Sequence, residues 1–227
     1  MSKLERTDRD VILLHAAFAV ACLLVLAIPS GIPAGQRLCG LVLLYNVSLP
    51  LAAWRRGHPE WLDLWLFLLP LSALQVFPDW FLSAQLGVLV FPDTGSTRIG
   101  AVPAFMAGLW TIPLFVVVLL GRRVASRSTR KVTLLVVAAA SLLLFVGSEA
   151  TLWSIPIWYA RDVTTVAHVA LYLIVPETLL GLSAFLAFES SLRRPSWYKL
   201  GAAFVVMLIY LGAACFFYFV LEGLLWA

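Results

Sequence analysis

Residues 200–226 read LGAAFVVMLIYLGAACFFYFVLEGLLW, a run whose only ionisable acid or base is Glu222. A helix needs about 20 apolar residues to cross the hydrocarbon core of a bilayer, so this run is long enough to span a membrane. The rest of the chain has the same character, because 62% of its 227 residues are hydrophobic and 12% are charged. About 25% of residues are charged in an ordinary soluble domain. The composition excludes a soluble globular protein and predicts a polytopic membrane protein.

Six further apolar runs precede this one, without the alternating pattern and turn residues of an outer-membrane barrel. We predict an all-α, polytopic transmembrane bundle of seven helices in a single domain over residues 1–227. The predicted helices cover residues 11–29, 38–54, 61–77, 102–120, 132–153, 163–188 and 200–226. Residues 80–91 are apolar but too short to cross, so we expect them to form an interfacial or re-entrant helix after the proline at position 78.

Basic residues alternate between successive connections, as the positive-inside rule requires of a correct helix count. With a cytoplasmic N-terminus and an extracytoplasmic C-terminus, all but three of the 16 basic residues fall on the cytoplasmic side. The three exceptions are Arg37, Arg98 and Arg161. We expect a multi-pass protein of a bacterial inner (plasma) membrane, whose basic loops face anionic lipid rather than nucleic acid. The alternative for residues 11–29 is a cleaved signal peptide, although this run exceeds the usual apolar core of about 7–15 residues.

Known catalytic and cofactor motifs are missing from the sequence. Cys22, Cys39 and Cys215 lie in apolar runs without C-x-x-C spacing, which argues against a disulfide framework and a zinc site. No serine-hydrolase, zinc-protease, P-loop or dinucleotide motif is present, and the 3 histidines are too scattered for a haem pair. No lysine lies mid-helix to form a retinal Schiff base. We therefore expect neither a metal nor another cofactor.

Acidic residues inside predicted helices are candidates for function, because ionisable groups are costly in a membrane. Glu177 lies near the middle of the predicted sixth helix, where a carboxyl is protonated, paired or beside water. It shares one helical face with three small residues, namely Ala170, Gly181 and Ala184. His168 and Tyr172 share the other side of this helix. We predict Glu177 as a catalytic residue and His168 as its partner; the alternatives are an interhelical hydrogen bond and an interfacial histidine.

Further acids are expected near the outer ends of the helices. Glu149 and Glu222 lie in the outer thirds of the predicted fifth and seventh helices, at comparable depth. We predict that they join other polar residues of the outer side in a polar mouth that binds substrate and supplies an acid or base. The other predicted members are Asp79, Asp93, Arg98, Asp162 and His168. The alternative is that the acids pair with Arg98 or Arg161 and tie loops together.

The outer loop before the predicted fourth helix is the most polar stretch on its side. Residues 91–100 read FPDTGSTRIG, with glycines that permit tight turns and Arg98, which suits a carboxylate or phosphate. In the helix that follows, Trp110 and Phe105 are candidates to present an aromatic face to a cationic intermediate. The alternatives are a simple connector and a lipid-facing tryptophan.

This glycine-containing loop, followed by Val102-Pro103 and Trp110, resembles a feature of small integral-membrane isoprenoid-modifying proteins, namely carotenoid hydratases and membrane-embedded lycopene cyclases. Intramembrane acids without a cofactor motif are part of the same resemblance. The P-E-E-type motif of the cyclases is reduced here to Pro176-Glu177-Thr178, which lacks the second acid.

The resemblance implies cofactor-free cyclisation, hydration or isomerisation of an isoprenoid or another membrane lipid. A carboxylic acid protonates an alkene, aromatic faces stabilise the carbocation, and a base or water ends the reaction. The matching residues are Glu177 or Glu149 for the acid, Trp110 and Tyr172 for the aromatic faces, and His168 or Glu222 for the base. Two other classes stay open: a proton-coupled carrier or receptor switched by Glu177, and a non-catalytic subunit or assembly factor with a protein partner or an oligomeric state.

Overall fold

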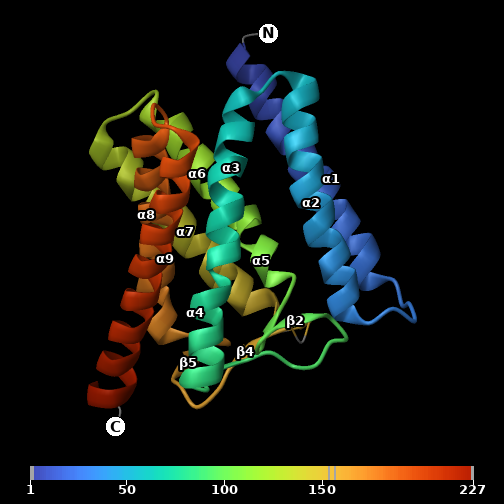
Figure 1. Ribbon diagram of the computed structural model, residues 1–227, viewed down its shortest axis with the longest axis vertical. Coiled ribbons are helices and arrows are strands. Elements are labelled where there is room, and N and C mark those ends of the chain that lie inside the picture. Colours follow the sequence, from blue (N-terminus) through green and yellow to red (C-terminus); the bar gives the residue numbers. More distant parts are fainter. Residues whose placement is uncertain (1–2, 153, 156, 226–227) are drawn as a thin grey trace.

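A computed structural model describes residues 3–152, 154–155 and 157–225 of the chain. Within these residues, seven helical spans are long and apolar enough to cross a membrane. They lie side by side in one bundle with the two termini at opposite ends (Figure 1), as an odd number of spans requires. The all-α, seven-span bundle predicted from the sequence is therefore confirmed. The side on which each terminus lies stays a prediction.

The helices come in chain order, and the longer connections between them contain short strands. They are α1 (Lys3–Ala27), α2 (Ala34–Arg56), α3 (Pro59–Leu74), α4 (Val76–Trp80), α5 (Met106–Leu109), α6 (Thr111–Ala125), α7 (Arg130–Leu152), α8 (Ile174–Ser191) and α9 (Ser196–Tyr218). Two π-helical turns, η1 (Phe81–Gln85) and η3 (Phe219–Leu225), and a 3₁₀ turn, η2 (Leu171–Leu173), extend α4, α9 and α8. The predicted ends at 153 and 226 lie outside the described residues.

Six two-residue strands gather at the end of the bundle near the C-terminus, which we call the hairpin end (Figure 1). They are β1 (Leu89–Val90), β2 (Arg98–Ile99), β3 (Val102–Pro103), β4 (Tyr159–Ala160), β5 (Thr165–Val166) and β6 (Val169–Ala170). β1 pairs with β4, β2 with β3 and β5 with β6, all antiparallel. We call the opposite end, which carries the N-terminus, the basic end.

The third span differs from the prediction. α3, α4 and η1 form one span, Pro59–Gln85, rather than a helix that stops at 77 and a separate interfacial helix over 80–91. Proline 78 does not end it, because Pro78 lies in the first turn of α4 and the next amide, of Asp79, still bonds the carbonyl of Gln75 at 3.2 Å. The helix ends instead before Gly87, whose φ of +71° suits glycine.

The sixth span is shorter than predicted, because residues 165–170 form the β5–β6 hairpin instead of helix. Its two-residue turn, Ala167 and His168, has φ of 49° and 68°, as in type I′ hairpin turns. The β-branched residues flanking this turn favour strands. Their high hydropathy is also typical of a membrane-spanning helix, which is why the sequence predicted one. As a consequence, His168 and Tyr172 do not share a helical face, and Glu177 lies in the first turn of α8 rather than in its middle.

The predicted fourth helix begins later than expected. Residues 102–103 form β3, and the span runs from Met106 to Ala125, with an irregular turn at Trp110 between α5 and α6. Pro113 explains this turn in part, because it has no amide to bond the carbonyl of Leu109. Asn46 of α2 supports the turn from outside, since its Nδ2 donates to the carbonyl of Gly108 at 3.1 Å.

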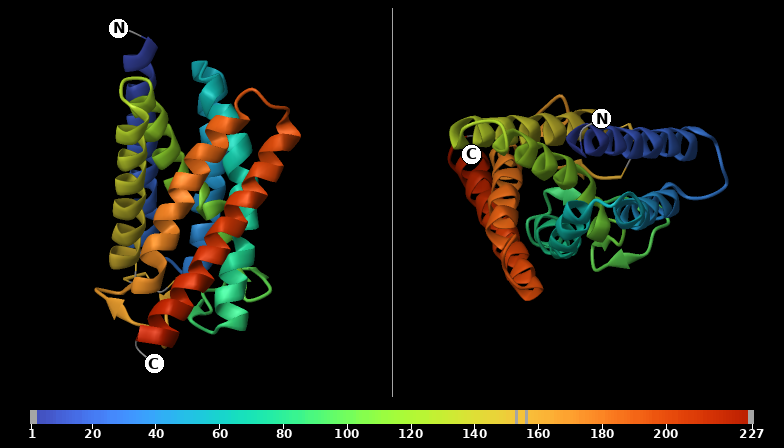
Figure 2. Two further views of the ribbon diagram at one scale, coloured as in Figure 1. Left: turned by 90° about the vertical axis from the view of Figure 1, so that its left-hand side faces the viewer. Right: turned by 90° about the horizontal axis from the view of Figure 1, so that it is seen from above.

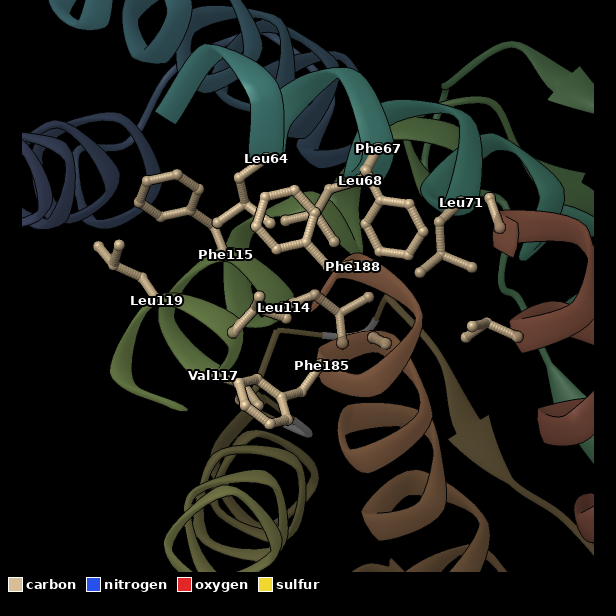
Figure 3. Close-up of a cluster of buried hydrophobic side chains, with 14 of the residues drawn as sticks. Leu64, Phe67, Leu68, Leu71, Leu114, Phe115, Val117, Leu119, Phe185 and Phe188 are labelled. Carbon is tan, nitrogen blue, oxygen red and sulfur yellow. The ribbon is translucent and has the colours of Figure 1, made fainter. Parts of the chain in front are cut away.

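The core lies between α3, α6 and α8, where leucine and phenylalanine side chains interdigitate (Figure 3). Close helix packing depends on small residues, since lipid offers no hydrophobic gain for association. Gly181 of α8 packs against the side chain of Ser141 of α7, and Ala184 one turn later is fully buried. The small-residue face predicted for these two positions is therefore a packing face.

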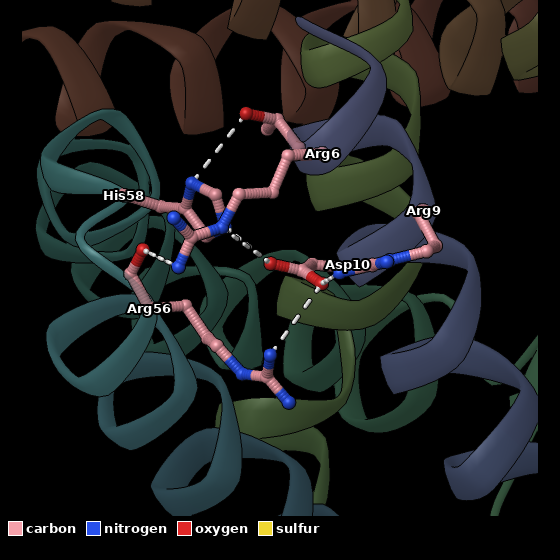
Figure 4. A network of polar contacts seen from close by, with 6 residues as sticks. Arg6, Arg9, Asp10, Arg56 and His58 are labelled. Atoms are coloured by element: carbon pink, nitrogen blue, oxygen red, sulfur yellow. Dashed lines mark hydrogen bonds and ion pairs between the residues drawn. The ribbon is translucent and has the colours of Figure 1, made fainter. Parts of the chain in front are cut away.

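Ion pairs hold the helices together at the basic end. The buried carboxylate of Asp10 on α1 accepts a hydrogen bond from His58 at 3.0 Å and lies 3.6–4.0 Å from three guanidinium groups (Figure 4). The three arginines are Arg6, Arg9 and Arg56. Seen along the bundle, α1 and α2 lie on one side and α8 and α9 on the other (Figure 2). Through His58 and Arg56, this network joins the exposed helix α1 to the residues that follow α2 and to α2 itself.

Candidate functional site

A cavity of about 310 Å³ lies in the half of the bundle near the hairpin end. Carboxyl side chains from three different helices line it: Asp79 of α4, Glu149 of α7 and Glu177 of α8. Most of the remaining wall is aliphatic or aromatic, and no lysine or arginine is among its lining residues. The predicted acids therefore converge on one site, which carries acidic groups without basic ones.

Asp79 is 2% exposed and has one hydrogen bond. The indole Nε1 of Trp110 donates to its Oδ2 at 3.3 Å. Trp110 lies at the turn between α5 and α6, opposite the third span. Asp79, predicted to bind substrate in an open polar mouth, instead lies inside the bundle beside the cavity.

Glu177 is 5% exposed and has no hydrogen-bond or ion-pair partner among the described residues. Its carboxyl lies within electrostatic range of Glu149 and Asp79. The preceding Pro176 lies in the same first turn of α8, where a proline leaves no intrahelical hydrogen bond unmade. A buried polar group without a protein partner calls for a ligand or an ordered water, so Glu177 points to an occupant of the cavity.

Glu149 is half-buried and lies between two cavities. Its Oε2 accepts a hydrogen bond from the amide of Ala170 at 3.1 Å, which ties α7 to the β5–β6 hairpin. A second cavity of about 90 Å³ has Glu149 in its wall together with His168 and Tyr172. These three predicted site residues are thus brought together, although only Glu149 also lines the main cavity.

Aromatic rings form one wall of the main cavity. The ring of Trp110 lies 5.6 Å from that of Phe145 and 5.8 Å from that of Tyr210, measured between centroids. Tyr210 lies in the middle of α9 and was not predicted. A tyrosine within the apolar run 200–226 is a usable signal for such a residue, since its hydroxyl is costly to bury unless it has a role.

Five predicted site residues lie outside both cavities. Arg98 donates to the carbonyls of Phe91, Pro92 and Ala101 at 2.8–2.9 Å, so its guanidinium holds the loop together. Phe105 is buried beneath that loop. The other three are Asp93, Asp162 and Glu222.

These three acids have partners outside the cavities. Asp93 accepts a hydrogen bond from the amide of Gly95 at 3.0 Å. Asp162 lies 3.7 Å from Arg161 on an exposed turn, and Glu222 accepts two hydrogen bonds from Thr164 at 2.9 and 3.1 Å. Of the three, Asp162 has an arginine partner of the kind that the alternative named, whereas Asp93 and Glu222 bond a backbone amide or a threonine.

The fold and this site define a polytopic membrane protein with an apolar cavity lined by carboxyl groups. Within that class, the chain belongs to the family described as a domain of unknown function, DUF6989, whose model matches residues 76–221. The matched segment contains Asp79, Glu149 and Glu177. No curated protein and no solved structure matches the chain. The family description names no isoprenoid enzyme.

Proposed function

We propose that this protein is an integral membrane enzyme that uses cofactor-free acid/base chemistry on an isoprenoid or another unsaturated lipid. The observation that carries the proposal is the cavity itself. Three carboxyls and five aromatic side chains line an apolar space whose lining includes no basic side chain. Such a space suits an apolar chain in which positive charge develops, because acidic groups and ring faces both stabilise a cation.

The position of the cavity mouth supports a substrate that arrives from the bilayer. Leu144 of α7 lines the cavity and is also 37% exposed on the side of the bundle. Ile112 and Val116 of α6, also lining residues, are partly exposed. The cavity therefore reaches the lateral surface between α6 and α7, which faces hydrocarbon in a membrane. Its volume of about 310 Å³ is at the lower end of the range of about 300–1,000 Å³ for ligand pockets.

Glu177 is the proposed acid, since it is the one cavity carboxyl that accepts no hydrogen bond from a described residue. Its O–H bond breaks while the π electrons of an alkene form a new C–H bond, which leaves a carbocation beside Trp110 and Tyr210. The cation then loses a C–H proton to the carboxylate of Asp79 or Glu149, and the electron pair of that bond forms a new alkene. Alternatively, water adds to the cation and gives up a proton to the same carboxylate.

Asp79 and Glu149 suit the role of base, because each accepts an N–H hydrogen bond of the kind that stabilises a carboxylate. His168 and Glu222, which the resemblance implied as bases, do not line the main cavity. The proposal therefore assigns the base to Asp79 or Glu149.

A proton-coupled carrier is the second candidate function. The observation in its favour is the buried carboxyl of Glu177, since acidic residues inside membrane spans often form proton relays in transporters. In that case Glu177 would bind and release a proton as a cationic or neutral cargo crosses.

The test is mass spectrometry of small molecules that co-purify with the full-length protein in mild detergent. The parent protein is compared with Glu177→Gln and with Glu60→Gln, which alters a carboxyl at the basic end that pairs with Arg122. We expect a bound isoprenoid whose product form is lost in Glu177→Gln and kept in Glu60→Gln, since a general acid contributes about 10²–10⁴-fold to a rate. The same generic phospholipid in all three samples would overturn the proposal, and an unchanged cargo with proton-dependent uptake into vesicles would favour the carrier.

A further inference from the structure

The smaller cavity lies directly beneath the β5–β6 hairpin and borders the main cavity. The two cavities share four lining residues, namely Leu89, Glu149, Trp158 and Leu173. Glu149 is the one carboxyl among these four. A single acidic side chain therefore stands between a small space near the end of the bundle and the large apolar space within it.

The walls of the small cavity are more polar than those of the large one. Besides Glu149, they include Tyr159, Thr165, His168 and Tyr172. A volume of about 90 Å³ is enough for several water molecules, since roughly 10–15 Å³ measured in this way holds one. Buried water needs two to four polar partners, and these side chains offer them.

The small cavity opens toward the hairpin end. Tyr159, Thr165 and His168 are exposed, so they form its rim, whereas Tyr172 and Leu173 are buried and form its floor. Its rim belongs to the strands and the turn at the end of the bundle, whereas the lining of the main cavity includes partly exposed side chains of α6 and α7 on the side of the bundle. We expect the rim of the small cavity to face water.

We propose that the smaller cavity is a water chamber through which Glu149 exchanges protons with the solution at the hairpin end. Water in the chamber delivers a proton to the carboxylate of Glu149, forming an O–H bond, and the proton is replaced from a hydronium ion of the bulk solution, which becomes water. The reverse transfer removes a proton. The use of that proton in the main cavity rests on the proposed function; the chamber and its exchange do not.

Several titratable groups surround this path and would share its protons. Tyr172 of η2 lies within electrostatic range of Glu149, Glu177, Tyr218 and Glu222. Tyr210 of α9 and Glu177 of α8 also lie within range of Glu149. From the hairpin end, the chamber is faced by His168 and Tyr159.

Hydroxyl-radical labelling tests the chamber, because X-ray pulses generate these radicals from water at the place where the water lies. Tyr172 and Tyr210 form a matched pair, since both are 1% exposed, yet Tyr172 lines the chamber and Tyr210 lines the apolar cavity. The full-length protein in detergent is diluted into ¹⁸O-labelled water, irradiated and analysed by mass spectrometry. We expect ¹⁸O on Tyr172 at several times the level on Tyr210. Equal labelling of the two tyrosines would overturn the proposal.

Two neighbouring substitutions on the hairpin test the route. Thr165→Trp fills the rim of the chamber, whereas Val166→Trp alters a residue that is exposed and does not line it. We expect Thr165→Trp to lower ¹⁸O on Tyr172 severalfold and Val166→Trp to leave it unchanged. If both variants label like the parent protein, water does not enter by this route. The experiment detects water and not turnover. A negative labelling result would therefore contradict the chamber but not the proposed chemistry, and absence of turnover would contradict the chemistry but not the chamber.

Discussion

The indole of Trp110 and the carboxyl of Asp79 are joined by a hydrogen bond of 3.3 Å that links the Met106–Ala125 span to the Pro59–Gln85 span. The bond connects an aromatic face of the cavity to one of its acids. It therefore fixes the orientation of both groups toward any molecule that the cavity holds.

Substitution Trp110→Phe keeps an aromatic ring and removes this hydrogen bond. We expect a loss of about 1–3 kcal/mol in the free energy of unfolding, because a buried acceptor is left unsatisfied. Thermal unfolding in detergent measures the loss. Trp65→Phe is the control, since the indole nitrogen of Trp65 has no hydrogen-bond partner among the described residues. Equal effects of the two substitutions would contradict the prediction.

A bulky residue at the lateral mouth should block the cavity. Leu144→Trp places an indole where α7 lines the cavity, whereas Leu143→Trp alters a neighbour that is 73% exposed and does not line it. We expect Leu144→Trp to reduce co-purifying apolar ligand severalfold and Leu143→Trp to retain it, as quantified by mass spectrometry. Equal ligand content in both variants would show that ligands enter elsewhere.

A side chain added at Gly181 should disturb the packing of α7 on α8. A Cβ at this position would collide with the side chain of Ser141, so we expect Gly181→Ala to destabilise the protein by about 1–3 kcal/mol, as overpacking does. Gly201→Ala is the control, because nothing lies within 4 Å of its added Cβ. The double variant Gly181→Ala with Ser141→Gly should recover stability in the same thermal assay.

The anchor of α1 should depend on His58. Substitution His58→Ala removes the hydrogen bond to the buried carboxylate of Asp10, and bonds to charged groups are worth about 1.5–3 kcal/mol. We expect faster amide hydrogen exchange in the first turns of α1, measured by mass spectrometry. Arg55→Ala, a nearby exposed residue outside the network, should leave the exchange unchanged. An unchanged rate in His58→Ala would show that the arginines suffice to hold α1.

The number of spans could be predicted from the sequence because hydropathy over about 20 residues measures burial in lipid directly. The exact ends of the helices could not be predicted in this way. A stretch such as 163–170 is rich in valine and threonine, and its hydropathy is the same in a helix as in a hairpin. The hairpin is favoured by two carboxyl groups of other spans. Glu149 accepts a hydrogen bond from the amide of Ala170, and Glu222 accepts one from the amide of Thr164. No local pattern contains those contacts.

The site shows the same division. Glu177 and Glu149 stand out in the sequence as carboxyls within apolar runs, and both line the cavity. Arg98 stands out equally, yet its donors are used by loop carbonyls. The sequence identifies ionisable groups that are costly to place in a membrane. Which of these groups line the same cavity depends on how the helices pack. Tyr210 was missed for the complementary reason, since one hydroxyl hardly alters the hydropathy of a long apolar run.

The ion pairs of the basic end join residues from different helices. Arg123 of α6 lies 2.8 Å from Asp8 of α1, and Arg122 lies 2.8 Å from Glu60 of α3 and 3.1 Å from Glu189 of α8. None of these pairs can form before the helices meet. During biosynthesis, the two arginines therefore carry unneutralised charge, available as orientation signals while each helix is inserted. We expect the same two side chains to orient their helices during insertion and to join them to neighbouring helices in the finished bundle, so their replacement should impair two stages of biogenesis that are separated in time.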